Sequence, residues 1–276
     1  MTQTSSYAIL KTRTLVRIGG PDWRDFLQGL LTQDVETLAP GEARFAALLT
    51  PQGRLLFDLF VVGRADGCWL DVAADRREAI IQRLSMYRLR AKVDIAADDT
   101  PVAALFPGDG ATPGAGWVQD PRLPALGLRG YGAGQPDGAA GADEAAYDAY
   151  RLSLGAPGPA DWGSESVYPI EANFDLLHGI DFKKGCFVGQ ETTSRMKRRG
   201  QIKNRMLPIT FDGPAPAPGA EVLAGTLRAG EVRSGGQGRA MIIARLDRVA
   251  LGGLTVNDRP VCAEPPAWMP IDAPES

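Results

Sequence analysis

The chain has 276 residues, of which 44% are hydrophobic, and a formal net charge of −3. A chain of this length can form two or three domains with sizeable cores. It does not begin with a basic start followed by an apolar run, and no stretch approaches the unbroken apolar length of a membrane span. We therefore predict neither a secretory signal nor a membrane anchor.

The cysteines and the single histidine limit the cellular compartment and the kinds of site that we predict. Cys68, Cys186 and Cys262 are widely separated and form no C-x-x-C pair. Such usage is typical of a reducing compartment, so we predict a cytoplasmic protein without a disulfide framework. The single histidine, His178, argues against a histidine-rich metal site and a Ser-His-Asp triad. We predict no metal site held by this chain alone.

The first hundred residues alternate between strand and helix patterns. Gly19-Gly20-Pro21 opens a helix with proline in its favoured first position. A second helix is expected over 75–88, where apolar residues follow helical spacing. Strands are expected at 12–18, 44–49, 54–62, 68–73 and 92–96, the second and third joined as a hairpin at 51–53. The pattern predicts an α+β unit with helices on one side of a sheet.

The rest of the chain is less regular. Residues 107–142 are rich in Gly, Pro and Ala and are expected to be mainly loop, with short strands at 117–118 and 125–128. A helix is expected over 143–154 and a loop over 156–166. Closely spaced strand patterns at 206–211, 221–223, 230–233, 240–246 and 254–256 predict a small antiparallel β-barrel, followed by a loose tail over 265–276.

The segment 181–195 carries the most specific chemistry. Two glycines bracket Cys186, and the pattern turns helical after Gly189. Lys183, Lys184 and Arg195 flank the thiol and should stabilise a thiolate, so its pKa should fall below the free value of about 8.5. The alternative is that Cys186 is a small buried hydrophobic residue in a glycine-punctuated connection.

Charge is strongly segregated around this segment. Between Lys183 and Arg205 there are eight Lys or Arg residues against one acid, Glu191. Such segregation marks a surface that meets an anion, or else a solvated basic helix face. An RNA-binding module using residues 183–205 is one alternative function. Phe187 is the only aromatic residue there, whereas single-strand binders stack bases on several. We therefore do not expect direct nucleic-acid binding.

Residues 184–191, KGCFVGQE, resemble the signature K-G-C-[YF]-x-G-Q-E of the YgfZ-type folate-binding proteins. These are relatives of the aminomethyltransferase (T-protein) of the glycine cleavage system and of mitochondrial iron–sulfur assembly factors. The resemblance extends to 26–35, 51–54, 169–174 and 178–180. It covers roughly residues 10–100 and 145–260.

The resemblance implies an α+β fold with three subdomains in a ring and a C-terminal antiparallel β-barrel. Residues 1–50 with 143–195 would form a discontinuous folate-binding subdomain, 51–142 a second α+β subdomain, and 205–270 the barrel. It also implies tetrahydrofolate or a derivative as ligand. The implied role is the assembly or repair of iron–sulfur clusters, including those of tRNA-modifying enzymes. The expected protein partners are iron–sulfur assembly factors or client proteins.

The resemblance also assigns the site residues. Cys186 would act as a reactive thiol or as a transient cluster ligand. One cysteine cannot hold a cluster in the usual four-thiolate manner, so any cluster contact would be shared or brief. A hydrophobic slot would receive the pterin, and cations the glutamate tail. The residues expected to bind the ligand are Lys184, Gly185, Phe187, Gly189, Gln190, Glu191, Arg195 and Asn173.

Two positions depart from the aminomethyltransferase pattern. An acidic residue that serves its folate chemistry falls on Ala79 here, although Asp75 and Glu78 lie close in sequence. A folate-contacting glutamate falls near Ser153. We therefore do not expect glycine cleavage, and whether any reaction is catalysed stays open. A tetrahydrofolate-dependent one-carbon (aminomethyl) transferase is kept as the alternative enzyme.

Overall fold

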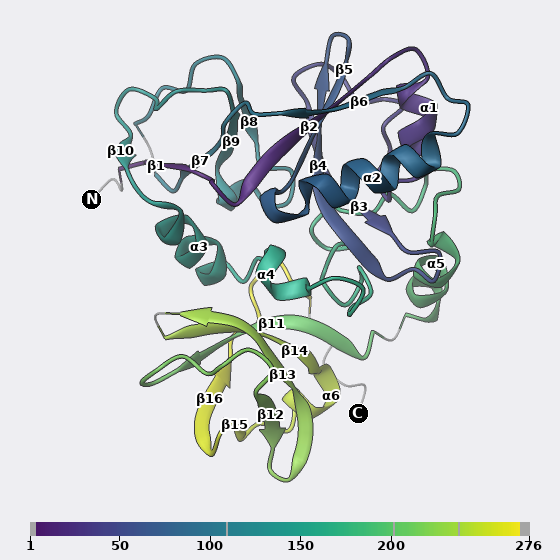
Figure 1. Ribbon diagram of the computed structural model, residues 1–276. Coiled ribbons are helices and arrows are strands. Elements are labelled where there is room, and N and C mark those ends of the chain that lie inside the picture. Colours follow the sequence, from purple (N-terminus) through teal and green to yellow (C-terminus); the bar gives the residue numbers. More distant parts are fainter. Residues whose placement is uncertain (1–3, 109, 201, 237, 271–276) are drawn as a thin grey trace. The chain divides into compact units, whose positions relative to one another are not determined.

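The computed structural model describes residues 4–108, 110–200, 202–236 and 238–270. The chain forms two compact units, and each is considered by itself. Unit 1 comprises Met1–Tyr147 and Leu177–Gln190, and unit 2 comprises Asp148–Leu176 and Glu191–Ser276. The predicted α+β class with a C-terminal antiparallel β-barrel is confirmed (Figure 1).

The larger core of unit 1 lies between one antiparallel sheet and two helices. The sheet order is β3-β4-β5-β2-β6. Its strands are β2 (Arg13–Gly19), β3 (Ala43–Leu49), β4 (Leu55–Arg64), β5 (Gly67–Ala73) and β6 (Asp94–Asp98). The helices are α1 (Trp23–Gln28) and α2 (Arg77–Arg88), the second entered through a 3₁₀ turn, η1 (Ala74–Arg76). Ile80 and Leu84 of α2 are fully buried in this core, as the helical spacing predicted.

A second sheet in unit 1 has the order β10-β1-β7-β9-β8. Its strands are β1 (Ser6–Ile9), β7 (Val102–Phe106), β8 (Trp117–Gln119), β9 (Leu128–Tyr131) and β10 (Ala140–Gly141). β1 and β7 were not predicted; β7 is buried at every position and so shows no alternation. β9 begins at Leu128, not at residue 125, because η2 (Pro124–Leu126) forms a 3₁₀ turn.

A buried network of charges connects the two sheets of unit 1. Asp71 on β5 is completely buried and accepts hydrogen bonds from Arg13 Nε at 2.7 Å and Arg129 Nη2 at 2.5 Å. The Tyr131 hydroxyl donates to the same carboxylate at 3.1 Å. Burial alone would raise the pKa of Asp71, but attraction to Arg129 and Arg13 outweighs it and holds that pKa below its usual range. Asp71 is therefore ionised and paired at neutral pH.

Unit 2 is built around a closed barrel of order β11-β14-β13-β12-β15-β16, in which β16 pairs back onto β11. Its strands are β11 (Asn204–Phe211), β12 (Glu221–Ala224), β13 (Leu227–Gly236), β14 (Arg239–Arg245), β15 (Leu254–Val256) and β16 (Arg259–Ala263). β16 was not predicted, because its short stretch contains Pro260 and lacks a clear alternation. Two short helices are α4 (Pro159–Trp162), in the predicted loop, and α6 (Leu246–Val249).

The chain passes between the units at three points, of which two lie in helices and the third lies between Leu176 and Leu177. α3 (Glu144–Ser153) and α5 (Gln190–Arg199) agree with the helices predicted there. The predicted boundary between residues 50 and 51 falls inside the β3–β4 hairpin, whose strands pair along their length. The division into three subdomains stays a prediction. Among the described residues, no helix combines the length and apolar character needed to cross a membrane.

Replacing Asp71 with alanine should destabilise the protein strongly. The change leaves Arg13 and Arg129 buried without their counter-charge, and breaking such a pair costs about 3–5 kcal/mol. Urea unfolding at pH 7 should show this loss. Asp71 has a lowered pKa in the folded protein, so its contribution should be present above about pH 4 and disappear as the pH falls further.

Asp99→Ala is the matched control. Asp99 also pairs with an arginine, Arg77, at 2.6 Å, but its side chain is 89% exposed. Loss of an exposed pair of this kind should cost no more than about 1 kcal/mol. Equal destabilisation by the two substitutions would contradict a structural role for the buried network.

Candidate functional site

The segment that carries the signature is fixed to the N-terminal part of unit 1 by Thr32. The Thr32 hydroxyl donates a hydrogen bond to the Gly179 carbonyl at 2.6 Å, and the Asp181 amide donates to the Thr32 carbonyl at 2.9 Å. Thr32 is completely buried, and its hydroxyl also accepts from the Ala47 amide on β3 at 2.8 Å. Thr32 therefore joins residues 179–181, which lead into the signature, to strand β3 of the main sheet.

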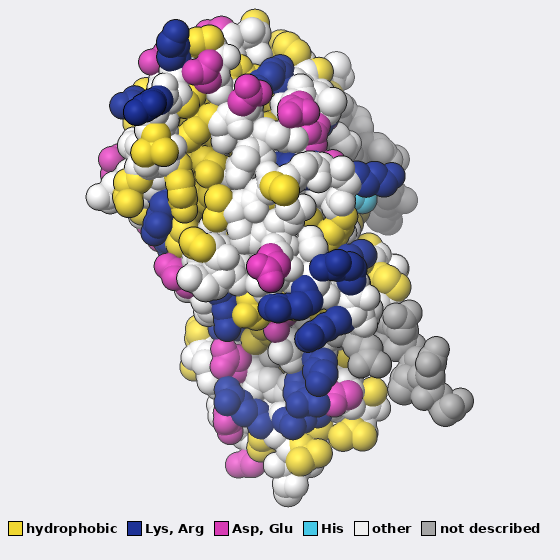
Figure 2. Space-filling model, turned by 90° about the vertical axis from the view of Figure 1, so that its right-hand side faces the viewer, with side chains coloured by type: hydrophobic (Ala, Val, Ile, Leu, Met, Phe, Trp, Pro, Cys, Tyr) yellow, Lys and Arg dark blue, Asp and Glu magenta, His cyan; other side chains and the backbone are white. Residues whose placement is uncertain are grey.

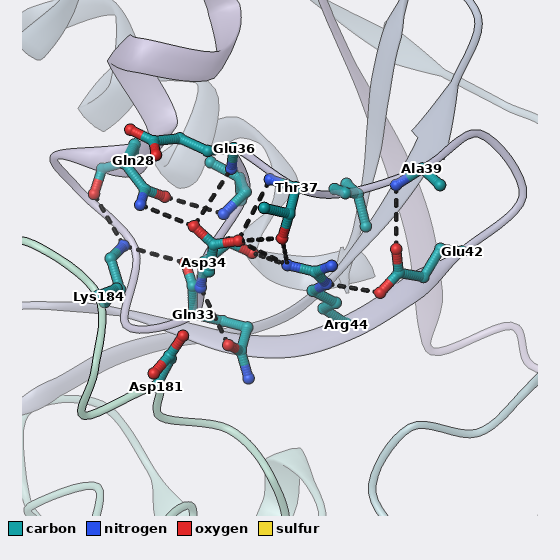
Figure 3. A network of polar contacts seen from close by, with 12 residues as sticks. Gln28, Gln33, Asp34, Glu36, Thr37, Ala39, Glu42, Arg44, Asp181 and Lys184 are labelled. Atoms are coloured by element: carbon teal, nitrogen blue, oxygen red, sulfur yellow. Dashed lines mark hydrogen bonds and ion pairs between the residues drawn. The ribbon is translucent and has the colours of Figure 1, made fainter.

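Lys184 makes the second attachment. Its ammonium donates to the main-chain carbonyls of Gln28 at 2.8 Å, Leu31 at 2.6 Å and Gln33 at 3.0 Å (Figure 3). It also lies 5.3 Å from the centre of the Phe187 ring, within the range of a cation–π contact. All three ammonium protons are used within the protein, so Lys184 holds the loop in place.

The surroundings of Lys184 lower its pKa but leave it charged. Burial lowers the pKa of Lys184 to about 8, and attraction to the carboxylates of Asp34, Asp181 and Glu36 partly offsets this. A lysine with this pKa is mainly protonated at pH 7. The ammonium can therefore donate its three hydrogen bonds under ordinary conditions.

Of the two glycines that flank Cys186, only Gly189 occupies a position that no other residue could take. Its φ is +81°, and a Cβ there would lie 2.6 Å from the Thr50 carbonyl oxygen and 3.0 Å from Gly53 Cα. No residue with a side chain fits so close to the β3–β4 hairpin. Gly185, in contrast, has open space around the position of a Cβ.

Cys186 is exposed at the edge of a pocket of about 780 Å³. The pocket is lined by Asp25, Gln28, Gly29, Asp34, Glu36, Thr37, Asp181, Lys183, Lys184, Gly185 and Cys186. The lining thus combines four carboxylates with one thiol and two lysines. This composition differs from the hydrophobic slot predicted for a pterin.

Asp34 lines the pocket and is the centre of a group of hydrogen bonds (Figure 3). Its carboxylate accepts from Gln28 Nε2 at 2.8 Å, from Arg44 Nη1 at 2.9 Å, and from the Thr37 hydroxyl. Burial would raise the pKa of Asp34, but the hydrogen bonds from Thr37, Gln28 and Arg44 outweigh it and hold the pKa well below its usual range. Asp34 therefore presents a fixed negative charge beside the pocket.

The electrostatic setting of the thiol differs from the one predicted. Lys184 was expected to stabilise a thiolate, yet its ammonium is directed at three main-chain carbonyls. Lys183 is exposed and lines the pocket with Cys186. The four carboxylates come from 25–36 and from Asp181, a contribution that was not predicted. The close spacing of Asp25, Asp34 and Glu36 in the sequence was the available signal.

The predicted ligand-binding residues occupy different positions. Lys184 and Gly185 line the pocket with Cys186. Phe187 is buried, and Gly189 is packed against the hairpin. Gln190 and Glu191 form the first turn of α5, and Arg195 is exposed on the same helix. No described feature tests whether any of them binds a ligand.

Asn173 has a structural environment in unit 2. Its side chain is completely buried, its amide donates to the Met206 carbonyl at 2.9 Å, and its φ is +63°. It is not among the described residues that line the pocket. Within the described residues no group of three or more His, Cys, Asp or Glu side chains could hold a metal ion.

Comparison with known proteins identifies relatives that match three quarters or more of the chain. The chain is 31% identical to the iron–sulfur cluster assembly factor IBA57 of Homo sapiens over 262 positions, covering 80% of this chain and 74% of that protein. It is 30% identical to the IBA57 protein of Mus musculus, covering 96% and 85%. It spans only about half, 54%, of the IBA57 homologue of Neurospora crassa, at 32% identity. Residues 203–271 match the family described as the CAF17 C-terminal β-barrel domain.

A solved structure shows the fold. The glycine cleavage system aminomethyltransferase T from Bartonella henselae superposes with a TM-score of 0.76, covering 96% of this chain and 86% of that one. The sequence identity is 17%, so this likeness establishes an aminomethyltransferase-like fold and nothing about activity.

These comparisons correct one prediction. The relatives are mitochondrial proteins, so the prediction of a cytoplasmic protein is wrong and the comparisons point to the mitochondrion. Free cysteines indicate a reducing compartment but do not distinguish one such compartment from another.

Replacing Lys184 with methionine should loosen the loop that carries Cys186. The carbonyls of Gln28, Leu31 and Gln33 would lose a charged donor, which should cost about 2–3 kcal/mol. Urea unfolding measures this loss, and amide hydrogen exchange over 182–188 should become faster. Lys183→Met is the control. Lys183 is exposed, so its loss should change stability by no more than about 0.5 kcal/mol. Unchanged exchange in Lys184→Met would contradict the attachment.

Proposed function

Because this chain belongs to the family of IBA57 iron–sulfur cluster assembly factors, we propose that it assembles or repairs iron–sulfur clusters through the thiol of Cys186. The observation that supports this proposal is the presentation of that thiol. Cys186 is exposed, whereas the residues on both sides of it are fixed by Lys184 and Gly189. A structural cysteine would be buried, as Cys68 is.

The chemistry of the proposed step follows from the number of ligands. The common clusters are held by four protein ligands, usually thiolates. Cys186 can supply one of them after losing its proton, and the others must come from a partner protein or from the cluster's donor. The cluster is cargo in this proposal, and contact with Cys186 is shared and brief. The exposed position of the thiol allows a second protein to approach it.

We also propose a folate-type ligand, tetrahydrofolate or a derivative, for the pocket beside Cys186. Its volume of about 780 Å³ lies in the range of small-molecule sites. The lining fits the polar edge of a pterin, whose adjacent N–H groups pair with a carboxylate such as Asp181 or Glu36. Lys183 is the cation available to the ligand's glutamate tail, because Lys184 is occupied by main-chain carbonyls. The bound group would carry one-carbon units; the protein residues bind and orient it.

Narrower roles rest on the resemblance of the signature alone. Membership of the YgfZ type, and support of tRNA-modifying enzymes as clients, would extend the assembly role to particular partners. A one-carbon transferase finds less support, because Ala79 offers no carboxylate and Ser153 uses its hydroxyl on the Tyr150 carbonyl at 2.6 Å. Ala79 and Ser153 are both exposed.

Cys186→Ala should abolish cluster-related activity and leave the fold intact. The thiol is exposed, so its removal should lower the melting temperature only slightly, and folate affinity should stay nearly unchanged. Activity is measured as recovery of an iron–sulfur enzyme in cells that lack the endogenous factor. Cys262→Ser, which removes the other exposed thiol, should keep full activity.

The rates of alkylation by iodoacetamide provide an independent measurement. Cys186 should react fastest. Cys68 should react slowest, because burial raises the pKa of its thiol. Full cellular activity of Cys186→Ala, or alkylation of Cys186 no faster than that of Cys262, would refute the proposed role.

Tetrahydrofolate should bind with measurable heat in titration calorimetry. Asp181→Asn should weaken binding about tenfold, because a lost charge-assisted hydrogen bond costs roughly 1.5 kcal/mol or more. Glu171→Gln is the control, because Glu171 belongs to unit 2 and does not line the pocket. Formation of methylenetetrahydrofolate from an aminomethylated carrier protein should be undetectable. Absence of binding would remove the ligand proposal, and robust transfer would favour the enzyme.

A further inference from the structure

A dense group of cations lies on unit 2, apart from the pocket beside Cys186. Five of the residues between 191 and 203 are cations against one acid, Glu191. Arg195, Arg198, Arg199 and Lys203 are exposed, and among the described residues they form no ion pair. Figure 2 shows a band of Lys and Arg side chains over α5 and the barrel. A counterpart of opposite charge would lower the self-repulsion of this group.

The cations continue from α5 onto the barrel through Lys203. The Leu246 amide donates to the Lys203 carbonyl at 2.9 Å, which places Lys203 at the start of α6. Arg245 precedes α6 and Arg248 lies within it. Asp247 contacts Arg245 at 2.6 Å and also attracts Arg248. The guanidinium of Arg248 donates to a main-chain carbonyl, that of Arg228.

An apolar pocket of about 400 Å³ adjoins these cations. It lies between α6, the 250–254 connection and β16, and its lining includes Leu246, Val249, Leu254, Val261 and Cys262. Leu246 is therefore both a wall of the pocket and the hydrogen-bond partner of Lys203. The neighbouring Leu251 is 66% exposed, which enlarges the apolar surface beside the pocket. The pocket therefore lies beside Arg245 in the sequence and is joined to Lys203 through the main chain of Leu246.

We infer that this area binds an acidic segment of a protein partner, with an apolar side chain of that segment inserted in the pocket. The basic strip (Arg195, Arg198, Arg199, Lys203 and Arg248) supplies attraction and orientation, as charged rims do at protein interfaces. The pocket supplies the buried anchor that carries most of the affinity. The binding surface does not include Cys186, so it can succeed or fail independently of the proposed cluster chemistry.

A protein partner fits better than a nucleic acid. Single-strand binders stack bases on aromatic side chains. The basic strip contains no aromatic residue, and Phe187, the only aromatic between 183 and 205, is buried. A purely electrostatic site for phosphates would also leave the apolar pocket without a function. The pocket and the cations are used together by a peptide that carries both acidic and apolar side chains.

The proposal is tested by fluorescence anisotropy on the full chain at 150 mM salt with three labelled probes of equal length. One is a glutamate peptide with two leucines, the second a glutamate-only peptide, and the third a single-stranded RNA. The leucine-containing peptide should bind about tenfold more tightly than the glutamate-only peptide, a typical effect of one apolar anchor. It should also bind more tightly than the RNA, and added salt should weaken its binding.

Variants separate the two parts of the surface. Arg198→Glu with Arg199→Glu should weaken both peptides about tenfold or more. Cys262→Phe, which fills the pocket from an exposed position, should remove the preference for leucine and leave the glutamate-only peptide unaffected. Arg88→Glu with Arg90→Glu reverses two exposed charges in unit 1 and should change neither.

Four outcomes would overturn the inference. Tighter binding of RNA would assign the cations to a nucleic acid. Equal weakening by Arg88→Glu with Arg90→Glu would show that peptide binding depends only on the overall charge of the protein. An unchanged leucine preference in Cys262→Phe would remove the pocket from the site. Tight peptide binding only after removal of residues 271–276 would assign the surface to the chain's own acidic C-terminal sequence, IDAPES.

Discussion

The ammonium of Lys184 is the interaction on which the candidate site depends. Three main-chain carbonyls between Gln28 and Gln33 converge on it, and each would be costly to bury without a donor. A lysine is suited to this position because its ammonium carries three protons on a flexible stem. Thr32 adds a second attachment a few residues away. The chain that leads to Cys186 is consequently held at Gly179 by Thr32 and at Lys184 by the three carbonyls. The thiol itself stays exposed.

Charged side chains have a different role in the interior of unit 1. In unit 1 the two sheets meet where buried Arg13 and Arg129 both donate hydrogen bonds to the buried carboxylate of Asp71. The Cζ atom of Arg129 lies 3.9 Å from the centre of the Phe60 ring. Such a network adds little net stability compared with apolar packing, but it penalises any arrangement in which one partner is lost. The network therefore constrains how the two sheets of unit 1 pack together.

The two units separate the charges of the protein into regions of opposite sign. The pocket beside Cys186 carries four carboxylates, because the chain brings Asp25, Asp34 and Glu36 next to Asp181. The basic strip lies on unit 2, although it follows the signature directly in sequence. An acidic pocket favours ligands that donate hydrogen bonds, whereas a basic surface favours acidic partners. The same short sequence therefore contributes to two surfaces with different chemical preferences.

The sequence alone determined the elements with strong local signals and the kinship with iron–sulfur assembly factors. Helical spacing located α2, glycine and proline turns located the β3–β4 hairpin, and the helical pattern after Gly189 located α5. It missed β7, since a fully buried run has no alternation. Only the tertiary structure decided what Lys184 does. A lysine beside a cysteine predicts a stabilised thiolate, but its ammonium was captured by carbonyls about 150 residues away in the sequence. Contacts between distant segments depend on how the chain folds back on itself, and local sequence does not encode which of several possible partners a long charged side chain will reach.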